Sequence, residues 1–134
     1  MDNNVTGEEI KKPVDPENLT EGEKKHIPVI EAPETVIAGE PFEVIVTVGS
    51  IPHVMEEKHY IEWIELYLQN KLMGRKELIP SSGEKARAAF RIEAEDICRN
   101  CGEKSVIINL RALERCNVHG IWEAYTEIKA TSSK

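Results

Sequence analysis

Three kinds of feature are scarce in this sequence, and each scarcity excludes a class of protein. No apolar stretch approaches the roughly 20 residues that a membrane-spanning helix needs, so no membrane partner is expected. Dense basic runs are missing and the net charge is −7, so nucleic acids and anionic lipid surfaces are not expected partners either. The three cysteines are an odd number, which argues against a disulfide framework and favours thiolate chemistry or a metal for at least one of them.

The chain has 134 residues, the length of a single domain with a short arm. Residues 1–21 are polar and acidic, contain Pro13 and Pro16, and lack the apolar segment of a secretory signal. We therefore expect a flexible or loosely docked N-terminal arm over residues 1–21, a folded domain over residues 22–134, and a cytoplasmic protein.

Strand signals dominate the rest of the chain, where segments rich in β-branched and aromatic residues alternate with turn signals. No segment repeats its apolar residues with a sustained helical period. About six to eight short strands with regular turns predict an antiparallel β-sandwich. The expected strands are Pro41–Gly49, Tyr60–Leu68, Arg87–Ile92, Ser105–Leu113 and Trp122–Ile128, with shorter ones at Val29–Ile30, Thr35–Ile37 and Leu72–Leu78.

All four histidines lie at the edge of an expected strand, in or beside a loop, and one cysteine accompanies the last of them. A single loop histidine is usually a solvated side chain, but Cys116 and His119 flank a tight turn that can aim both side chains at one point, as zinc sites do. Four imidazoles and one thiolate exceed the four ligands of closed zinc and favour iron. A blue-copper site would need a weak axial ligand beyond the turn, usually Met, and the last methionine is Met73.

The same residues lie in segments that resemble the superoxide reductases, specifically the one-iron neelaredoxin-like group of the desulfoferrodoxin iron-binding domain family. The similarity extends from about Gly22 to Ile128, and its C-terminal segment, with the sequence Cys-Asn-Val-His-Gly, is highly specific. The four matching segments are Gly22–Glu31, Ile51–His59 with its six-residue spacing between two histidines, Trp63–Tyr67, and Cys116–Glu123.

This resemblance implies an all-β fold, an immunoglobulin-like antiparallel β-sandwich of about seven strands with the metal site in loops at one end. It implies one iron ion (Fe2+/Fe3+) per chain, reduction of superoxide to hydrogen peroxide with one external electron and two protons, and no release of oxygen. It also implies rubredoxin or a similar small protein as the electron donor, and a homotetramer. The implied iron ligands are the imidazoles of His26, His53, His59 and His119, in a plane, with the sulfur of Cys116 below.

One departure from the family pattern concerns the sixth iron position. The family motif has a glutamate two residues before its histidine with one lysine between them, whereas Lys24 and Lys25 both separate Glu23 from His26 here. Glu23 is the preferred candidate for a sixth ligand, and either lysine is a candidate for attracting superoxide. The sequence alone leaves open which lysine faces the iron and whether Glu23 reaches it.

A second departure lies in the middle of the chain, which is shorter than in typical members and carries Cys98 and Cys101, outside the iron motif. These residues are free thiols, a local disulfide, or half of a metal site shared with a neighbouring subunit. Two other functions remain open for the whole chain: a non-catalytic metal-binding immunoglobulin-like module and an electron carrier. Five donors with an open sixth position favour the enzyme, because an electron carrier would prefer a metal whose coordination shell is closed.

Overall fold

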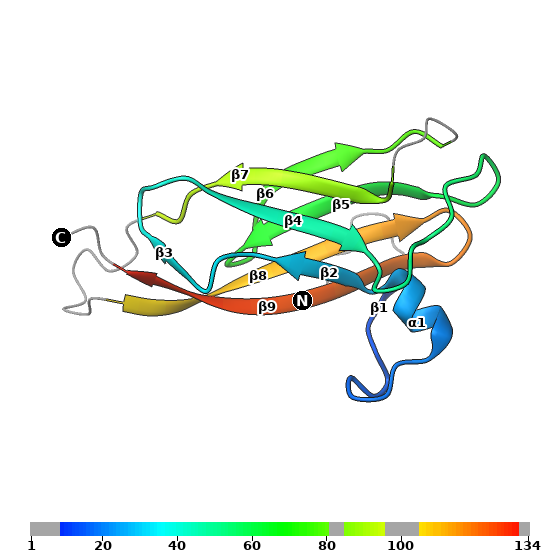
Figure 1. Cartoon of the computed structure of the whole chain (residues 1–134), viewed down its shortest axis with the longest axis horizontal. Coiled ribbons are helices and arrows are strands. Elements are labelled where there is room, and N and C mark those ends of the chain that lie inside the picture. The colour runs from blue at the N-terminus through cyan, green and yellow to red at the C-terminus, as the bar shows by residue number, and fades with distance from the viewer. Residues whose placement is uncertain (1–8, 81–84, 96–104, 132–134) are drawn as a thin grey trace.

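The computed structural model describes residues 9–80, 85–95 and 105–131 (Figure 1). Cys98 and Cys101 lie outside these residues. The described residues form nine strands and one helix, in the order β1 (Ile10–Lys11), α1 (Glu21–His26), β2 (Pro28–Glu31), β3 (Thr35–Ile37), β4 (Phe42–Val48), β5 (Ile61–Leu68), β6 (Lys71–Glu77), β7 (Arg87–Ile92), β8 (Ser105–Cys116) and β9 (Gly120–Thr131).

The strands form two sheets, which confirms the predicted all-β sandwich (Figure 1). The larger sheet runs in the order β1-β9-β8-β5-β6, with β3 also pairing with β9, and the smaller sheet runs β2-β4-β7. Alternate side chains of both sheets point into a shared apolar core, to which Val44 and Val46 of β4 and Ile64 and Leu66 of β5 belong. The main predicted strands are all present.

Strands β8 and β9 are longer than predicted and continue to the ligand turn. They pair antiparallel from Ser105 opposite Thr131 to Cys116 opposite Gly120, so the hairpin closes directly on the Cys116–Gly120 turn. Gly120 has φ of 87°, a left-handed conformation that glycine adopts without steric cost. The continuous pairing places the turn rigidly at one end of the sandwich.

The outer face of the larger sheet carries a small second apolar cluster of Trp63, Leu113 and Ile121. Ile10, from the N-terminal arm, packs against it, because β1 pairs in parallel with β9. The sequence predicts no strand in the arm, since two residues are too short to show a period. The division of the chain at residue 21 stays a prediction.

Helix α1 is the other element that the apolar pattern does not predict. Its start is a capping box, in which the Thr20 side chain accepts a hydrogen bond from the Glu23 N–H and the Glu23 side chain accepts one from the Thr20 N–H. Its six residues have no apolar stripe, and only this cap marks it in the sequence. It is also the sole helix of the described residues and is far too short to cross a membrane.

Candidate metal centre

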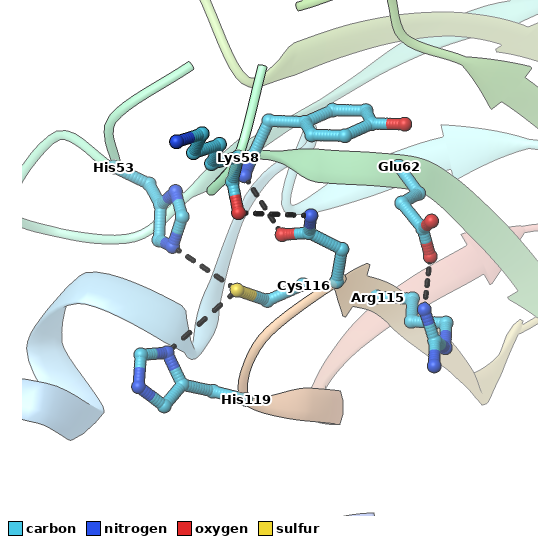
Figure 2. Close-up of polar contacts among 8 residues, drawn as sticks. His53, Lys58, Glu62, Arg115, Cys116 and His119 are labelled. Atoms are coloured by element: carbon cyan, nitrogen blue, oxygen red, sulfur yellow. Dashed lines mark hydrogen bonds and ion pairs between the residues drawn. The ribbon is translucent and has the colours of Figure 1, made fainter. Parts of the chain in front are cut away.

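The predicted ligands come from separate parts of the chain and meet at one end of the sandwich. His26 ends helix α1, His53 and His59 lie in the loop between β4 and β5, Cys116 ends β8, and His119 lies in the turn to β9. Figure 2 shows His53 and His119 on either side of the Cys116 sulfur. The topology therefore brings together residues up to 93 positions apart, from His26 to His119.

The four imidazole rings form a closed square. The ring centroid of His26 lies 4.8 Å from those of both His53 and His119. The centroid of His59 lies 4.7 Å from that of His53 and 5.0 Å from that of His119. Neighbouring ring planes are inclined by 66° to 81°, so the rings meet edge to face rather than stacking.

Two of the rings are oriented by backbone carbonyls on their outer side. Nδ1 of His26 donates to the Gly22 carbonyl at 2.7 Å, and Nδ1 of His53 donates to the Val54 carbonyl at 2.6 Å. Such bonds fix the tautomer that leaves Nε2 free to bind a metal. The two Nε2 atoms lie 3.2 Å apart, directed at a common point.

The Cys116 sulfur lies beside this point. Sγ is 3.5 Å from His53 Nε2 and 3.7 Å from His119 Nδ1, and the Cys116 side chain is fully buried (Figure 2). The ligand atoms of His26, His59, Cys116 and His119 all lie within 4.8 Å of one another.

The buried Nε2 of His59 has no hydrogen-bond partner within the described part of the chain. Buried ring nitrogens are normally satisfied, so this orphan atom points to a ligand. Four nitrogens and one sulfur fit iron better than tetrahedral zinc.

Burial lowers the pKa values of three of the histidines in the site. Burial lowers the pKa of His53 to about 4, and burial is also the main cause that lowers the pKa values of His26 and His119. These rings are therefore neutral near pH 7, the form that binds a metal. Burial raises the pKa of Cys116, while hydrogen bonds from the backbone N–H groups of Val118 and His119 lower it. A bound cation stabilises the thiolate and reverses the effect of burial.

A cavity of about 580 Å³ opens over the square of imidazoles. All four histidines line it, whereas Cys116 does not. One side of the square is therefore open to small molecules, and the buried sulfur lies away from the opening. The other residues that line the cavity include Lys11, Glu23, Lys25 and Trp122.

The structure places the two predicted lysines differently. Lys25 is half-buried, lines the cavity, and has its Nζ 3.8 Å from the carboxylate of Glu21 one turn earlier. Lys24 is exposed and does not line the cavity, and its backbone carbonyl accepts a hydrogen bond from the Ile51 N–H at 3.1 Å. Lys25 is thus the lysine of helix α1 that faces the candidate site.

Glu23 also lines the cavity, but both of its carboxylate oxygens are engaged. Oε1 accepts the Thr20 N–H at 2.8 Å and Oε2 accepts the Val14 N–H at 3.2 Å. These hydrogen bonds lower the pKa of Glu23. Metal binding by this carboxylate requires that it leave at least one of these partners, so its role as a sixth ligand stays a prediction.

Asn117 is a supporting residue that the sequence does not mark as part of the site. Its Oδ1 accepts the Tyr60 N–H at 2.9 Å, and its Nδ2 donates to the Lys58 carbonyl at 3.2 Å (Figure 2). Because Lys58 and Tyr60 flank His59, this one side chain ties the ligand turn to the loop that carries His59. Its position beside Cys116 is the only signal in the sequence.

Trp122 and Glu114 face each other across strands β9 and β8, next to the site. The Trp122 ring stacks on His26 at 5.0 Å with 17° between the planes. Both Glu114 oxygens are buried without a hydrogen-bond partner among the described residues, and burial raises the Glu114 pKa well above its usual value. Strand alternation carries Glu114 to the same face as Cys116, so its inward position is readable from the sequence.

Comparison with known proteins gives consistent matches over most of the chain. The family model described as Desulfoferrodoxin matches residues 18–125. A Desulfoferrodoxin of Syntrophotalea carbinolica is 38% identical over 109 residues, which cover 81% of this chain and 68% of that protein. A Superoxide reductase of Pyrococcus horikoshii is 33% identical over 115 residues, covering 79% of this chain and 89% of that protein.

Solved structures match as well. The Superoxide reductase (Neelaredoxin) from Ignicoccus hospitalis superposes with a TM-score of 0.72 and 35% identity, over 90% of this chain and 94% of that one. The similarity extends beyond the ligand segments to the whole sandwich.

Proposed function

We propose that this chain, which belongs to the desulfoferrodoxin family, is a superoxide reductase that converts superoxide to hydrogen peroxide without releasing oxygen. One observation carries the proposal: the square of four imidazoles has a buried sulfur away from the opening and a cavity above it. Such a site holds a metal firmly and leaves room for a small substrate.

The proposed ligands of a single iron ion per chain are His26, His53, His59, His119 and Cys116. Bound there, the iron supplies the electron that superoxide accepts, and an external donor restores it. The balanced reaction is superoxide plus one electron plus two protons to hydrogen peroxide.

The protein's own residues then have three tasks. The backbone N–H groups of Val118 and His119 donate hydrogen bonds to the Cys116 sulfur and so favour the thiolate that a bound cation stabilises. The ammonium of Lys25 at the cavity attracts the superoxide anion, although the chain as a whole is acidic. Water beside Lys25 delivers the two protons. Glu23, once released from the arm, is the proposed sixth ligand of the oxidised site.

Two further properties are part of the proposal and follow the family resemblance: rubredoxin or a similar small electron donor, and assembly as a homotetramer. The cytoplasmic location stays a prediction from the sequence. The non-catalytic module and the electron carrier are less favoured, because neither needs a cavity of about 580 Å³ over the metal ligands.

The first test is the metal itself. Purified protein loaded with iron without oxygen should contain one iron per chain and become blue on oxidation, from charge transfer between thiolate and ferric iron. Cys116→Ser should abolish the colour. Pulse radiolysis should then show that superoxide oxidises the reduced protein at a rate near the diffusion limit. Colourless protein that retains zinc instead of iron would refute the enzyme.

The second test identifies the lysine of helix α1. Lys25→Ala should slow the reaction with superoxide, whereas Lys24→Ala should leave the rate near that of the wild type, because Lys25 lines the cavity and Lys24 does not. Equal and unchanged rates in both variants would exclude these lysines from substrate attraction.

A further inference from the structure

The N-terminal arm brings a further lysine to the metal cavity. Strand β1 pairs in parallel with β9, with Lys11 opposite Trp122, immediately after the ligand turn. Figure 1 shows β1 beside helix α1 at the end of the sandwich where the ligands meet. Lys11 is half-buried and lines the cavity together with the four histidines.

The ammonium group of Lys11 is held in place by the site. Its Nζ donates a hydrogen bond to the His119 carbonyl at 2.8 Å and lies 5.3 Å from the centre of the Trp122 ring. Both contacts favour a cation, since a carbonyl oxygen accepts the N–H and the ring face is electron-rich.

The two neighbouring lysines differ from Lys11 in having acidic partners. Lys25 lies 3.8 Å from Glu21, and Lys12 lies 4.0 Å from Glu123. No carboxylate pairs with Lys11 anywhere in residues 9–80, 85–95 and 105–131. Of the two lysines that line the cavity, Lys11 is therefore the one whose charge is less neutralised by a nearby carboxylate.

The arm is fixed on both sides of Lys11. Before it, Ile10 packs on the cluster of Trp63, Leu113 and Ile121. After it, the Val14 N–H donates to Glu23 Oε2 at 3.2 Å. An arm held at these two points presents Lys11 at a defined position instead of as a mobile side chain.

We propose that Lys11 supplies the unpaired positive charge that draws superoxide into the cavity, together with Lys25, and that Glu23 positions the arm that carries it. This inference rests on the proposed function. It assigns the arm to the site and gives Glu23 a role that does not require contact with the metal.

The test uses four variants of the iron-loaded full chain. Lys11→Ala removes the charge, Lys11→Gln keeps a donor for the His119 carbonyl without the charge, and Lys11→Arg keeps the charge. Lys12→Ala is the matched control, because it removes the same charge at the next residue. The Lys12 side chain is exposed and does not line the cavity.

At low ionic strength, Lys11→Ala and Lys11→Gln should each lower the second-order rate constant for superoxide by about two- to threefold, as expected for one unit charge at close range in water. Lys11→Arg and Lys12→Ala should stay near the wild type. The differences should disappear in about 0.5 M salt, where the Debye length is only a few ångströms.

A second measurement does not depend on turnover. Azide titrated into the oxidised protein and followed by its absorption should bind about two- to threefold more weakly to Lys11→Ala and Lys11→Gln than to Lys12→Ala. Wild-type protein that fails to react with superoxide would overturn the proposed function, yet the azide comparison would still test Lys11.

Amide exchange of residues 10–14 establishes whether the arm stays docked in each variant. If Lys11→Ala releases the arm, Lys11→Gln decides the question. Wild-type rates and azide affinities in Lys11→Gln, or equal losses in Lys12→Ala, would overturn the role of Lys11.

Discussion

Replacing Asn117 with alanine tests whether one side chain holds His59 in the ligand square. The substitution removes the acceptor of the Tyr60 N–H at 2.9 Å and the donor to the Lys58 carbonyl at 3.2 Å. The Tyr60 N–H is part-buried and would lose its partner, whereas the exposed Lys58 carbonyl can turn to water. Only the first loss has a substantial cost.

The magnitude follows from that difference. A buried N–H left unpaired costs about 1–3 kcal/mol, so we expect the metal-free Asn117→Ala protein to lose about 1–2 kcal/mol in unfolding free energy. Loss of a residue that orients a metal ligand typically costs about 10- to 100-fold in metal affinity. Since one ligand of the proposed five is affected, we expect a value near the lower end, about tenfold.

Urea unfolding of the metal-free protein gives the first quantity, and competition with a chelator gives the second. Asn109→Ala, at an exposed position of strand β8, controls for a general effect of losing an asparagine. Asn117→Asp keeps the acceptor for Tyr60 and should retain most of the stability. Unchanged metal affinity in Asn117→Ala would refute the reasoning, as would an equal loss in the Asn109 control.

Two other predictions concern packing and pH. Gly49→Ala should lower the unfolding free energy by about 1–3 kcal/mol and weaken metal binding, because a Cβ there collides with the Lys24 carbonyl in the helix that carries His26. Wild-type values in unfolding and in chelator competition would contradict this. Burial and a hydrogen bond to Glu65 raise the pKa of Tyr67 to about 12. The native state therefore keeps a proton that the unfolded chain loses above a pH of about 10, so this contribution to stability is complete below pH 10 and is lost as the pH rises to about 12. Tyr67→Phe should make unfolding less sensitive to pH in that range and remove from an ultraviolet titration the phenol that ionises near pH 12.

The strands and the ligand residues are the parts of this protein that the sequence predicts well. Alternating apolar side chains identify β4, β7 and the inner face of β8, because one face of each is buried and the other is not. The Cys116–His119 spacing identifies the ligand turn, since a short turn by itself fixes how the two side chains lie relative to each other. Both signals depend on residues that are close together in the chain.

The missed features depend on contacts between distant segments. The Ile10–Lys11 strand exists only because Ile121 and Trp122 offer it a sheet edge, and two residues carry no pattern of their own. The choice between Lys24 and Lys25 depends on how helix α1 packs against the loop at Ile51, which spacing along the chain does not reveal. Helix α1 is an intermediate case, because its capping box is local but six residues are too few for a period.

The two roles of Glu23 exclude each other at any one moment, and this gives a last prediction. The carboxylate oxygens that would bind oxidised iron are the same atoms that accept the Thr20 and Val14 N–H groups. If Glu23 becomes a ligand on oxidation, at least one of these two amides loses its acceptor and should exchange with solvent faster in the ferric protein than in the ferrous protein. Amide exchange followed by mass spectrometry measures this, with the β8–β9 hairpin as the internal reference. Equal exchange in both states would assign Glu23 to the arm alone. Faster exchange only on oxidation would mean that the iron's redox state also controls how firmly the arm presents Lys11.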